Sequence, residues 1–240
     1  MSPPPVPADH VYTRCYCEEN IYTLADALNR TVASADDTGV AWDAYVVFVS
    51  NHQKTVALWH QKAREGVVVW DYHVVLLLRA RIALGKSAPP DGETTEAWVY
   101  DFDSCAPVPC LWQDYMRATF PYAFSGRWEV PAQYVSLFRV VPAQEYLDHF
   151  VSDRSHMLVQ GQLDVYAAEP PPYPSLRGRK ASNSQLKTNL MPSFVNMRSH
   201  VSDSGLHLAD DVTEARTYGR VLGISDFISW LSGEASTAAE

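Results

Sequence analysis

Long hydrophobic runs are missing from this sequence. A membrane-spanning helix needs about 20 consecutive apolar residues, whereas the longest apolar stretch here, residues 67–78, is interrupted by Asp71 and His73. The first residues are rich in proline and have neither a basic start nor the apolar core of a secretion signal. We therefore expect no membrane association and a cytoplasmic location, or a location shared between cytoplasm and nucleus.

An excess of positive charge is also missing. The chain has 19 Lys and Arg residues against 28 Asp and Glu residues, for a net charge of −9 at pH 7. Without a basic stripe to neutralise phosphates, the chain is not expected to bind nucleic acid as its main task. Hydrophobic residues make up 47% of its 240 residues, which is enough for one large domain with a full core.

Cysteines are few, and their spacing disfavours a metal site. The four cysteines are Cys15, Cys17, Cys105 and Cys110. In a reducing compartment they are expected to be free thiols. Structural zinc sites favour cysteine pairs two to four residues apart on tight turns. The first pair here is separated by one residue, and Pro107 and Pro109 stiffen the second pair. We therefore predict no metal.

A cysteine stands where a helix is expected to begin. The apolar residues that follow it recur at helical spacing and predict a helix over residues 17–30. They are Ile21, Leu24, Ala25 and Leu28. A thiol at a helix N-terminus lies near free N–H groups and the positive end of the helix dipole, which favour the thiolate. The alternative interpretation of Cys17 is a buried structural cysteine.

Several β-branched and aromatic stretches predict an antiparallel sheet next to this helix. The expected strands are residues 45–49, 55–59, 67–78, 97–103 and 134–141, and the expected further helices are residues 111–120, 143–150 and 226–231. Strands 45–49 and 55–59 are expected to form a hairpin because a short turn separates them. Helices with a mainly antiparallel sheet make an α+β fold. The polar stretch 177–218 predicts a surface excursion.

The two longest strands bring a histidine and a carboxylate together. If residues 67–78 and 97–103 pair as a hairpin centred near residue 87, His73 lies opposite Asp101, within a slip of one or two residues. A thiol, an imidazole and a carboxylate are the groups that nucleophilic acyl transfer needs, and papain-like and transglutaminase-like folds hold them on a helix and a sheet. The alternatives are a structural core histidine at His73, and Asp103 in place of Asp101.

Six sequence blocks resemble the protein N-terminal glutamine amidohydrolase family. The blocks are residues 15–21, 70–76, 100–103, 107–111, 152–157 and 170–174, and residues 219–227 resemble the closing segment of the family. They occur in the order found in the family. Residues 199–218 depart from the family pattern and are interpreted as an insertion. The resemblance implies a single catalytic domain over residues 11–231. The proline-rich residues 1–10 are expected to be disordered, and the small polar residues 232–240 are expected to form a frayed tail. We also expect a monomer.

The resemblance implies an enzyme that hydrolyses the side-chain amide of an N-terminal glutamine. The product is N-terminal glutamate, an early step of an N-degron route, and the partners are proteins or peptides that begin with glutamine. The resemblance also implies α/β/α layers similar to transglutaminases and no cofactor. Carried over by motif, the nucleophile is Cys17, the base is His73 and the orienting carboxylate is Asp101.

Restriction to a first residue requires recognition of the substrate's α-ammonium group, for which a desolvated carboxylate is suited. The candidate substrate-binding residues are Glu18, Glu19, Asp71, Asp103 and Arg154. Each has a structural alternative. The two glutamates favour a helix N-terminus, the two aspartates can satisfy neighbouring backbone groups, and Arg154 can pair with Asp153 to fix a turn.

Two other functions remain open at this point. A papain-like peptidase or a transglutaminase-like acyl transferase can use the same three residues. A non-catalytic adaptor can read N-termini, or can present the polyproline segment 170–174 to a partner.

Overall fold

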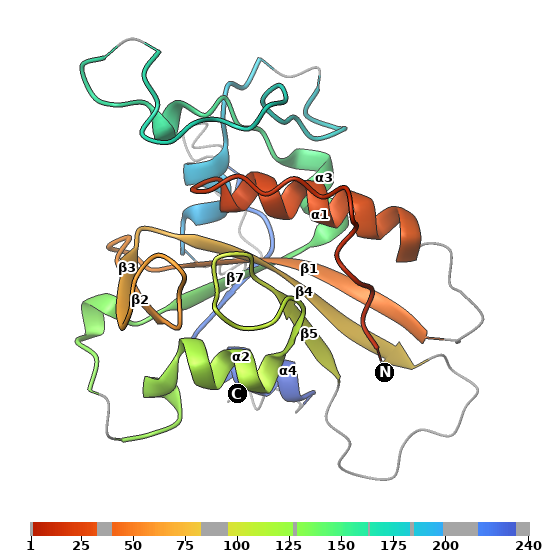
Figure 1. The fold of residues 1–240 in the computed structure, drawn as a ribbon, viewed down its shortest axis with the longest axis vertical. Helices are drawn as coiled ribbons and strands as arrows, with labels where there is room; N and C mark the ends of the chain where they lie inside the picture. Colours follow the sequence, from red (N-terminus) through yellow and green to blue (C-terminus); the bar gives the residue numbers. More distant parts are fainter. Residues whose placement is uncertain are drawn as a thin grey trace, which may run out of the picture.

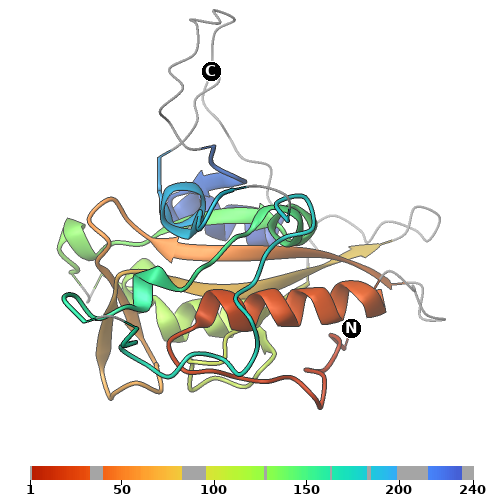
Figure 2. The same cartoon turned by 90° about the horizontal axis from the view of Figure 1, so that it is seen from above.

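The computed structural model of the chain describes residues 2–32, 40–82, 96–126, 129–162, 164–182, 185–198 and 216–233. In these residues a six-stranded antiparallel sheet has helices on both faces, and a two-stranded ribbon lies beside it (Figures 1 and 2). The predicted α+β combination is therefore confirmed. Among the described helices, none has the length and apolar character to cross a bilayer.

The strand order of the main sheet is β6-β5-β4-β1-β7-β8, and β2 pairs with β3 in the ribbon. The strands are β1 Val40–Ser50, β2 Val56–Trp59, β3 Val67–Trp70, β4 His73–Ile82, β5 Ala97–Tyr100, β6 Cys110–Leu111, β7 Leu137–Pro142 and β8 Arg220–Leu222. The helices are α1 Cys17–Val32, α2 Trp112–Thr119, α3 Ala143–His149 and α4 Ile224–Ser232, with a π-helix at Leu190–Val195.

Alternation along the central strands divides the core into two halves. Side chains on β1 and β4 point to opposite faces in turn. Val46 and Phe48 pack with α1 and α3 on one face, whereas Val47 and Val49 pack with α2 and α4 on the other. Figure 1 shows α1 and α3 above the sheet and α2 and α4 below it. Cys17, the first residue of α1, therefore packs on the face of the sheet that α1 and α3 cover.

The predicted hairpin between residues 45–49 and 55–59 is wrong. β1 is a central strand that pairs with β4 and β7, and β2 pairs with β3 instead. Asn51 turns the chain away after β1, because its side-chain nitrogen donates to the carbonyls of Thr55, at 2.6 Å, and Gln133, at 2.7 Å. An asparagine that satisfies nearby backbone groups replaces the hydrogen bonds of a tight hairpin.

The predicted strand 67–78 is interrupted at Asp71. β3 ends at Trp70 and β4 begins at His73. The Asp71 carboxylate accepts a hydrogen bond from the N–H of Tyr72 at 2.9 Å, and its carbonyl accepts one from Ser50 Oγ at 2.6 Å. These local bonds replace sheet pairing at the point where the chain passes from the ribbon into the main sheet.

The described part of the polar stretch 177–218 is not only a surface excursion. Leu190, Phe194 and Val195 are almost fully buried in the core half that contains α1. Arg139 on β7 is 1% exposed and donates to the carbonyls of Asn196, Arg198 and Tyr218. Residues 199–215, which contain most of the predicted insertion, lie outside the described residues, as do residues 234–240 of the predicted tail.

Residues 2–10, for which we expect disorder, lie against the domain in the structure. The Tyr100 hydroxyl, on a fully buried residue, donates to the carbonyl of Pro4 at 2.5 Å. The His10 ring stacks on Phe102 with ring centroids 4.6 Å apart, and Val6 packs against the core. A buried hydroxyl needs an acceptor, which gives this proline-rich segment a fixed attachment.

Candidate active site

Cys17 is the first residue of α1, as the sequence predicts. The turn before it is held by Asn20, whose side chain accepts from the N–H of Thr13 at 2.9 Å and donates to its carbonyl at 2.8 Å. Cys15 adopts the left-handed conformation, with φ of 67°. This turn places the Cys17 thiol at the N-terminal end of α1, next to β4.

His73 and Asp101 form a buried pair. His73 Nε2 lies 2.8 Å from Asp101 Oδ1, and the two residues are 1% and 2% exposed. Asp101 also accepts hydrogen bonds from the Tyr115 hydroxyl at 2.8 Å and from the N–H of Asp103 at 2.9 Å. These donors fix the carboxylate, so the ring of His73 is oriented through Nε2 and Nδ1 is left as the nitrogen available to a thiol.

The register of this hairpin differs by two residues from the predicted one. Leu76 pairs with Tyr100 and Leu78 with Trp98, so Asp101 lies just beyond the last paired residue of β5. A shift of two residues leaves every side chain on its original face. His73 and Asp101 therefore still meet, within the slip that the sequence analysis allows.

The pair also shifts the acidity of both groups. Burial lowers the pKa of His73, but the charge of Asp101 and its hydrogen bond outweigh burial and raise the His73 pKa above its ordinary 6.5. Burial likewise raises the pKa of Asp101, but His73, Tyr115 and the Asp103 N–H outweigh it and hold that pKa below its ordinary value. Each partner thus stabilises the charged form of the other.

The environment of Cys17 works against the expected thiolate. Burial raises the pKa of the Cys17 thiol well above its ordinary value, and the nearby charges of Glu18 and Asp103 raise it further. A hydrogen bond with the backbone of Val74 lowers it only in part. Burial and the nearby acids therefore favour the protonated thiol over the thiolate that a helix N-terminus would stabilise.

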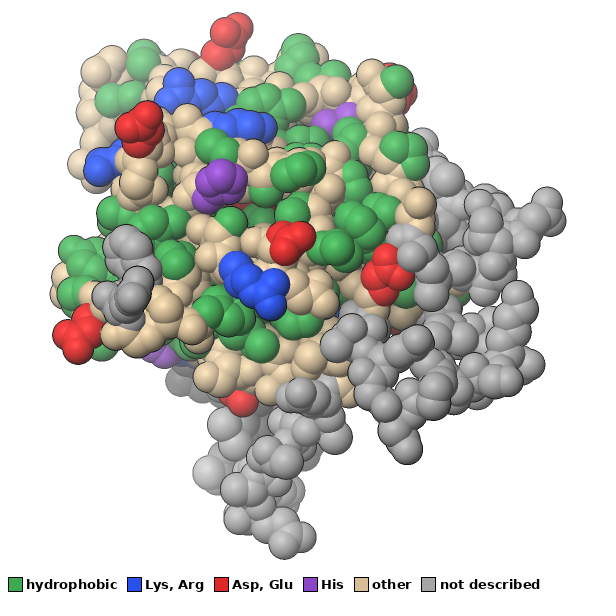
Figure 3. Space-filling view, turned by 60° about the horizontal axis from the view of Figure 1, so that its bottom comes forward, with side chains coloured by type: hydrophobic (Ala, Val, Ile, Leu, Met, Phe, Trp, Pro, Cys, Tyr) green, Lys and Arg blue, Asp and Glu red, His purple; other side chains and the backbone are tan. Residues whose placement is uncertain are grey.

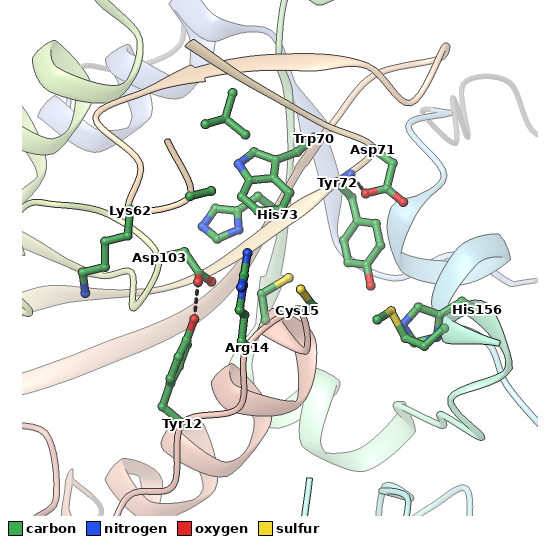
Figure 4. Close-up of a pocket in the computed structure, with 14 residues that line it drawn as sticks. Tyr12, Arg14, Cys15, Lys62, Trp70, Asp71, Tyr72, His73, Asp103 and His156 are labelled. Carbon is green, nitrogen blue, oxygen red and sulfur yellow. Dashed lines mark hydrogen bonds between the residues drawn. The ribbon is translucent and has the colours of Figure 1, made fainter. Parts of the chain in front are cut away.

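A pocket of about 770 Å³ opens beside these groups (Figure 4). Its lining residues are Tyr12, Arg14, Cys15, Cys17, Lys62, Ala63, Val68, Trp70, Asp71, Tyr72, His73, Asp103, His156 and Met157. Cys17 and His73 thus share one cavity. On the face of the molecule in Figure 3, the described acidic and basic side chains are interspersed with hydrophobic ones.

The predicted substrate-binding residues fall into two groups. Asp71 and Asp103 line the pocket, whereas Glu18, Glu19 and Arg154 are buried behind it. The Asp103 carboxylate accepts a hydrogen bond from the Tyr12 hydroxyl at 2.5 Å (Figure 4). None of the three buried residues is among those that line the pocket.

Arg154 pairs with Glu19 and not with Asp153. Its Nε donates to Glu19 Oε1 at 2.9 Å and its Nη2 to Glu19 Oε2 at 2.8 Å. Asp153 instead accepts from the N–H of Ser155 at 3.0 Å. The arginine also donates to the carbonyl of Tyr173 at 2.9 Å. This bidentate pair joins the start of α1 to two loops that follow α3, so its geometry supports a structural role.

We predict that Arg154→Met destabilises the protein by about 3–5 kcal/mol, because it leaves a buried carboxylate without its partner. Urea unfolding measures the loss. The matched control is the double variant Glu19→Gln with Arg154→Met, which removes the stranded charge and is expected to recover part of the stability. Equal losses in the single and double variants would show that the ion pair is not the cause.

Sequence analysis missed two tyrosines at this site, and for His156 it predicted a position on the rim but not its contact with Glu18. Tyr115 on α2 holds Asp101, Tyr72 donates to Glu18 Oε2 at 3.1 Å, and His156 lies 3.2 Å from Glu18 Oε1. A signal was present for Tyr115, since a tyrosine on the buried face of a predicted helix needs a partner for its hydroxyl. Its partner was beyond prediction because it depends on how α2 packs against β5.

Three side chains at this site are of the kinds that can bind a metal ion. His73, Asp101 and Asp103 each offer one ligand atom, and these atoms lie within 4.8 Å of one another. Asp101, however, already accepts three hydrogen bonds, and His73 Nε2 is bonded to it. Binding of a metal ion would break this network. The prediction of a site without metal is retained on that ground.

A thiol and an imidazole on one pocket, with a buried carboxylate behind the imidazole, are the groups that a thiol-dependent acyl-transfer enzyme requires. Comparison with known proteins gives the family. A family model described as N-terminal glutamine amidase matches residues 12–230. The chain belongs to this family, which confirms the resemblance found in the sequence.

Three relatives illustrate the similarity, each named protein N-terminal glutamine amidohydrolase. The Homo sapiens protein is 33% identical over 205 residues, covering 85% of this chain and 86% of the relative. The Oryza sativa subsp. indica protein is 34% identical over 229 residues, covering 92% and 88%. The Arabidopsis thaliana protein is 38% identical over 166 residues, covering 68% and 66%.

Proposed function

We propose that this protein hydrolyses the side-chain amide of an N-terminal glutamine, giving N-terminal glutamate and ammonia. The observation that carries the proposal is the buried pair of His73 and Asp101, at 2.8 Å, on the pocket that Cys17 lines. The names of the relatives point to the same substrate. The geometry of the site supports the reaction type, and membership of the family indicates which amide is hydrolysed.

In the proposed mechanism, the Cys17 sulfur attacks the side-chain carbonyl carbon as His73 takes the thiol proton. The first N–H groups of a helix have no partner within the helix, and those at the start of α1 stabilise the oxyanion. His73, now an imidazolium beside Asp101, returns the proton to the departing ammonia. A water molecule that His73 deprotonates then hydrolyses the thioester, which releases glutamate and restores the thiol.

We predict that kcat/KM falls on the acidic side of its pH profile, with a half-maximal point above pH 6.5. The thiol is protonated at rest, so His73 must be neutral to accept its proton, and the His73 pKa is raised above 6.5. Protonation of His73 therefore removes the base as the pH falls through that raised value. An acidic limb near pH 4 would instead indicate a preformed thiolate and contradict the protonated resting thiol.

The proposal is tested with three peptides that begin with glutamine, begin with asparagine, or carry glutamine only internally. We expect ammonia from the first peptide alone, with the chain intact by mass spectrometry. Cleaved peptide would indicate a papain-like peptidase, and transfer to an added amine would indicate a transglutaminase-like transferase. Binding without turnover would indicate an adaptor.

The arrangement of α1 against an antiparallel sheet also supports a relationship to the transglutaminase and papain-like folds, which we propose as the finer fold assignment. A monomeric state, a cytoplasmic or nuclear location and the absence of nucleic-acid and membrane partners remain proposals. Size-exclusion chromatography tests the first of these directly.

A further inference from the structure

His156 occupies a position on the pocket that the proposed mechanism does not use. Its side chain is 10% exposed. Its Nε2 lies in ion-pair distance of Glu18, whereas Nδ1 is buried and has no hydrogen-bond partner among the described residues. In Figure 4 it lies with Tyr72 and Asp71 on one side of the pocket, across from Tyr12, Lys62 and Asp103. A buried ring nitrogen without a partner costs free energy unless a ligand supplies one.

Glu18 lies directly behind this histidine. Its side chain is 0% exposed, and one oxygen accepts the hydrogen bond of Tyr72, whereas Oε1 has no hydrogen-bond partner in the described structure. His156 Nε2 is 3.2 Å from Oε1. A proton on Nε2 therefore faces the carboxylate, and Nδ1 is left as a buried acceptor without a donor.

We propose that His156 and Glu18 form the subsite that binds the α-ammonium group of the substrate. His156 Nδ1 accepts one N–H of the ammonium group, and the carboxylate of Glu18 supplies the negative charge behind the ring. This inference rests on the proposed function and adds to it the group that distinguishes a first residue from an internal one, since an internal glutamine has an uncharged amide in place of the ammonium group.

The separation of the two subsites fits the length of glutamine. Four bonds of roughly 1.5 Å join the side-chain carbonyl carbon to the α-nitrogen, so these atoms lie within about 5 Å of each other. Glu18 Oε2 is 3.7 Å from Cys17 Sγ. Because Glu18 contacts both Cys17 and His156, a glutamine whose carbonyl lies against the thiol is long enough to bring its ammonium group towards His156.

The two other acids close to the thiol are less suited to this task. Asp71 already accepts a hydrogen bond from the N–H of Tyr72. Asp103 already accepts the Tyr12 hydroxyl, and its carboxylate lies within 4.8 Å of His73 and Asp101. An ammonium group at that position would repel the imidazolium that forms during the reaction. The negative charge of Glu18 raises the pKa of Cys17. An ammonium group bound beside Glu18 would offset that charge, so the bound substrate would itself favour loss of the thiol proton.

The test compares two peptides in the full-length protein. One peptide begins with glutamine, and the other begins with a 4-carbamoylbutanoyl group, which is glutamine without its α-ammonium group. We expect wild type to prefer the first peptide by about thirtyfold or more in kcat/KM, equivalent to about 2 kcal/mol. His156→Asn and Glu18→Gln are each expected to reduce this preference to below about fivefold. Met157→Leu, a neighbouring change on the same pocket, is expected to keep it.

Turnover of the 4-carbamoylbutanoyl peptide is the internal control for folding, since a variant that still hydrolyses it has an intact thiol and histidine. A preference that survives in both variants, or an equal loss on both peptides, would overturn the inference. A wild-type enzyme that hydrolyses both peptides equally would also overturn it and leave the proposed function standing. Absence of ammonia from the glutamine-starting peptide with wild type would instead contradict the proposed function.

Discussion

Cys17→Ala is expected to reduce kcat for a glutamine-starting peptide by at least about a thousandfold. Without the sulfur no thioester forms, and only binding and oxyanion stabilisation remain to assist attack by water. Cys17 is partly exposed at the start of α1 and lines the same pocket as His73, so the substitution removes one sulfur and leaves the core packing nearly unchanged. Ammonia release under saturating substrate measures the effect.

The matched control is Cys15→Ala. Cys15 is exposed and lines the same pocket two residues earlier, so it tests which of the two thiols reacts. We expect this variant to retain turnover. Loss of activity in Cys15→Ala together with activity in Cys17→Ala would transfer the nucleophile to Cys15, and activity in both variants would show that neither thiol is required.

Asp101→Asn is expected to lower kcat by roughly a hundredfold to ten-thousandfold. The amide keeps the size of the side chain but removes the charge that stabilises the His73 imidazolium. Because burial lowers the pKa of His73 and Asp101 raises it, loss of the charge should move that pKa below its ordinary value. The acidic limb of the pH profile is therefore expected to shift to lower pH while the rate falls.

Tyr115→Phe is the control for this change. It removes one hydrogen bond to Asp101, from the Tyr115 hydroxyl at 2.8 Å, and leaves the charge in place. We expect a loss of about tenfold or less, in line with a single hydrogen bond to a charged group. An Asp101→Asn variant with the wild-type rate and pH profile would show that the carboxylate does not act through His73.

Local patterns predicted where the candidate residues Cys17, His73 and Asp101 lie because their positions depend on short-range features. Apolar spacing located α1 and placed Cys17 at its start, and strand alternation made the contact of His73 with Asp101 insensitive to a register shift of two residues. The failures concern long-range choices. Whether the strand after Asn51 returns as a hairpin depends on its bonds to Gln133, which lies 82 residues further on.

The electrostatics of the site was the least predictable part. The helix N-terminus and the thiol were visible in the sequence, but the burial of Glu18 beside that thiol was not. Glu19 and Arg154 were interpreted as candidates for substrate binding, whereas their mutual hydrogen bonds join segments 135 residues apart. Pairing of buried charges is settled by tertiary packing, for which sequence spacing gives no signal.

The most direct test of the account uses a peptide whose first residue carries a diazoketone in place of the glutamine side-chain amide. Such a group alkylates the nucleophile that attacks it. The account predicts one covalent adduct, on Cys17, which forms more slowly in Asp101→Asn and is prevented by excess glutamine-starting peptide. An adduct on Cys15 or on any other residue, with Cys17 unmodified, would contradict it.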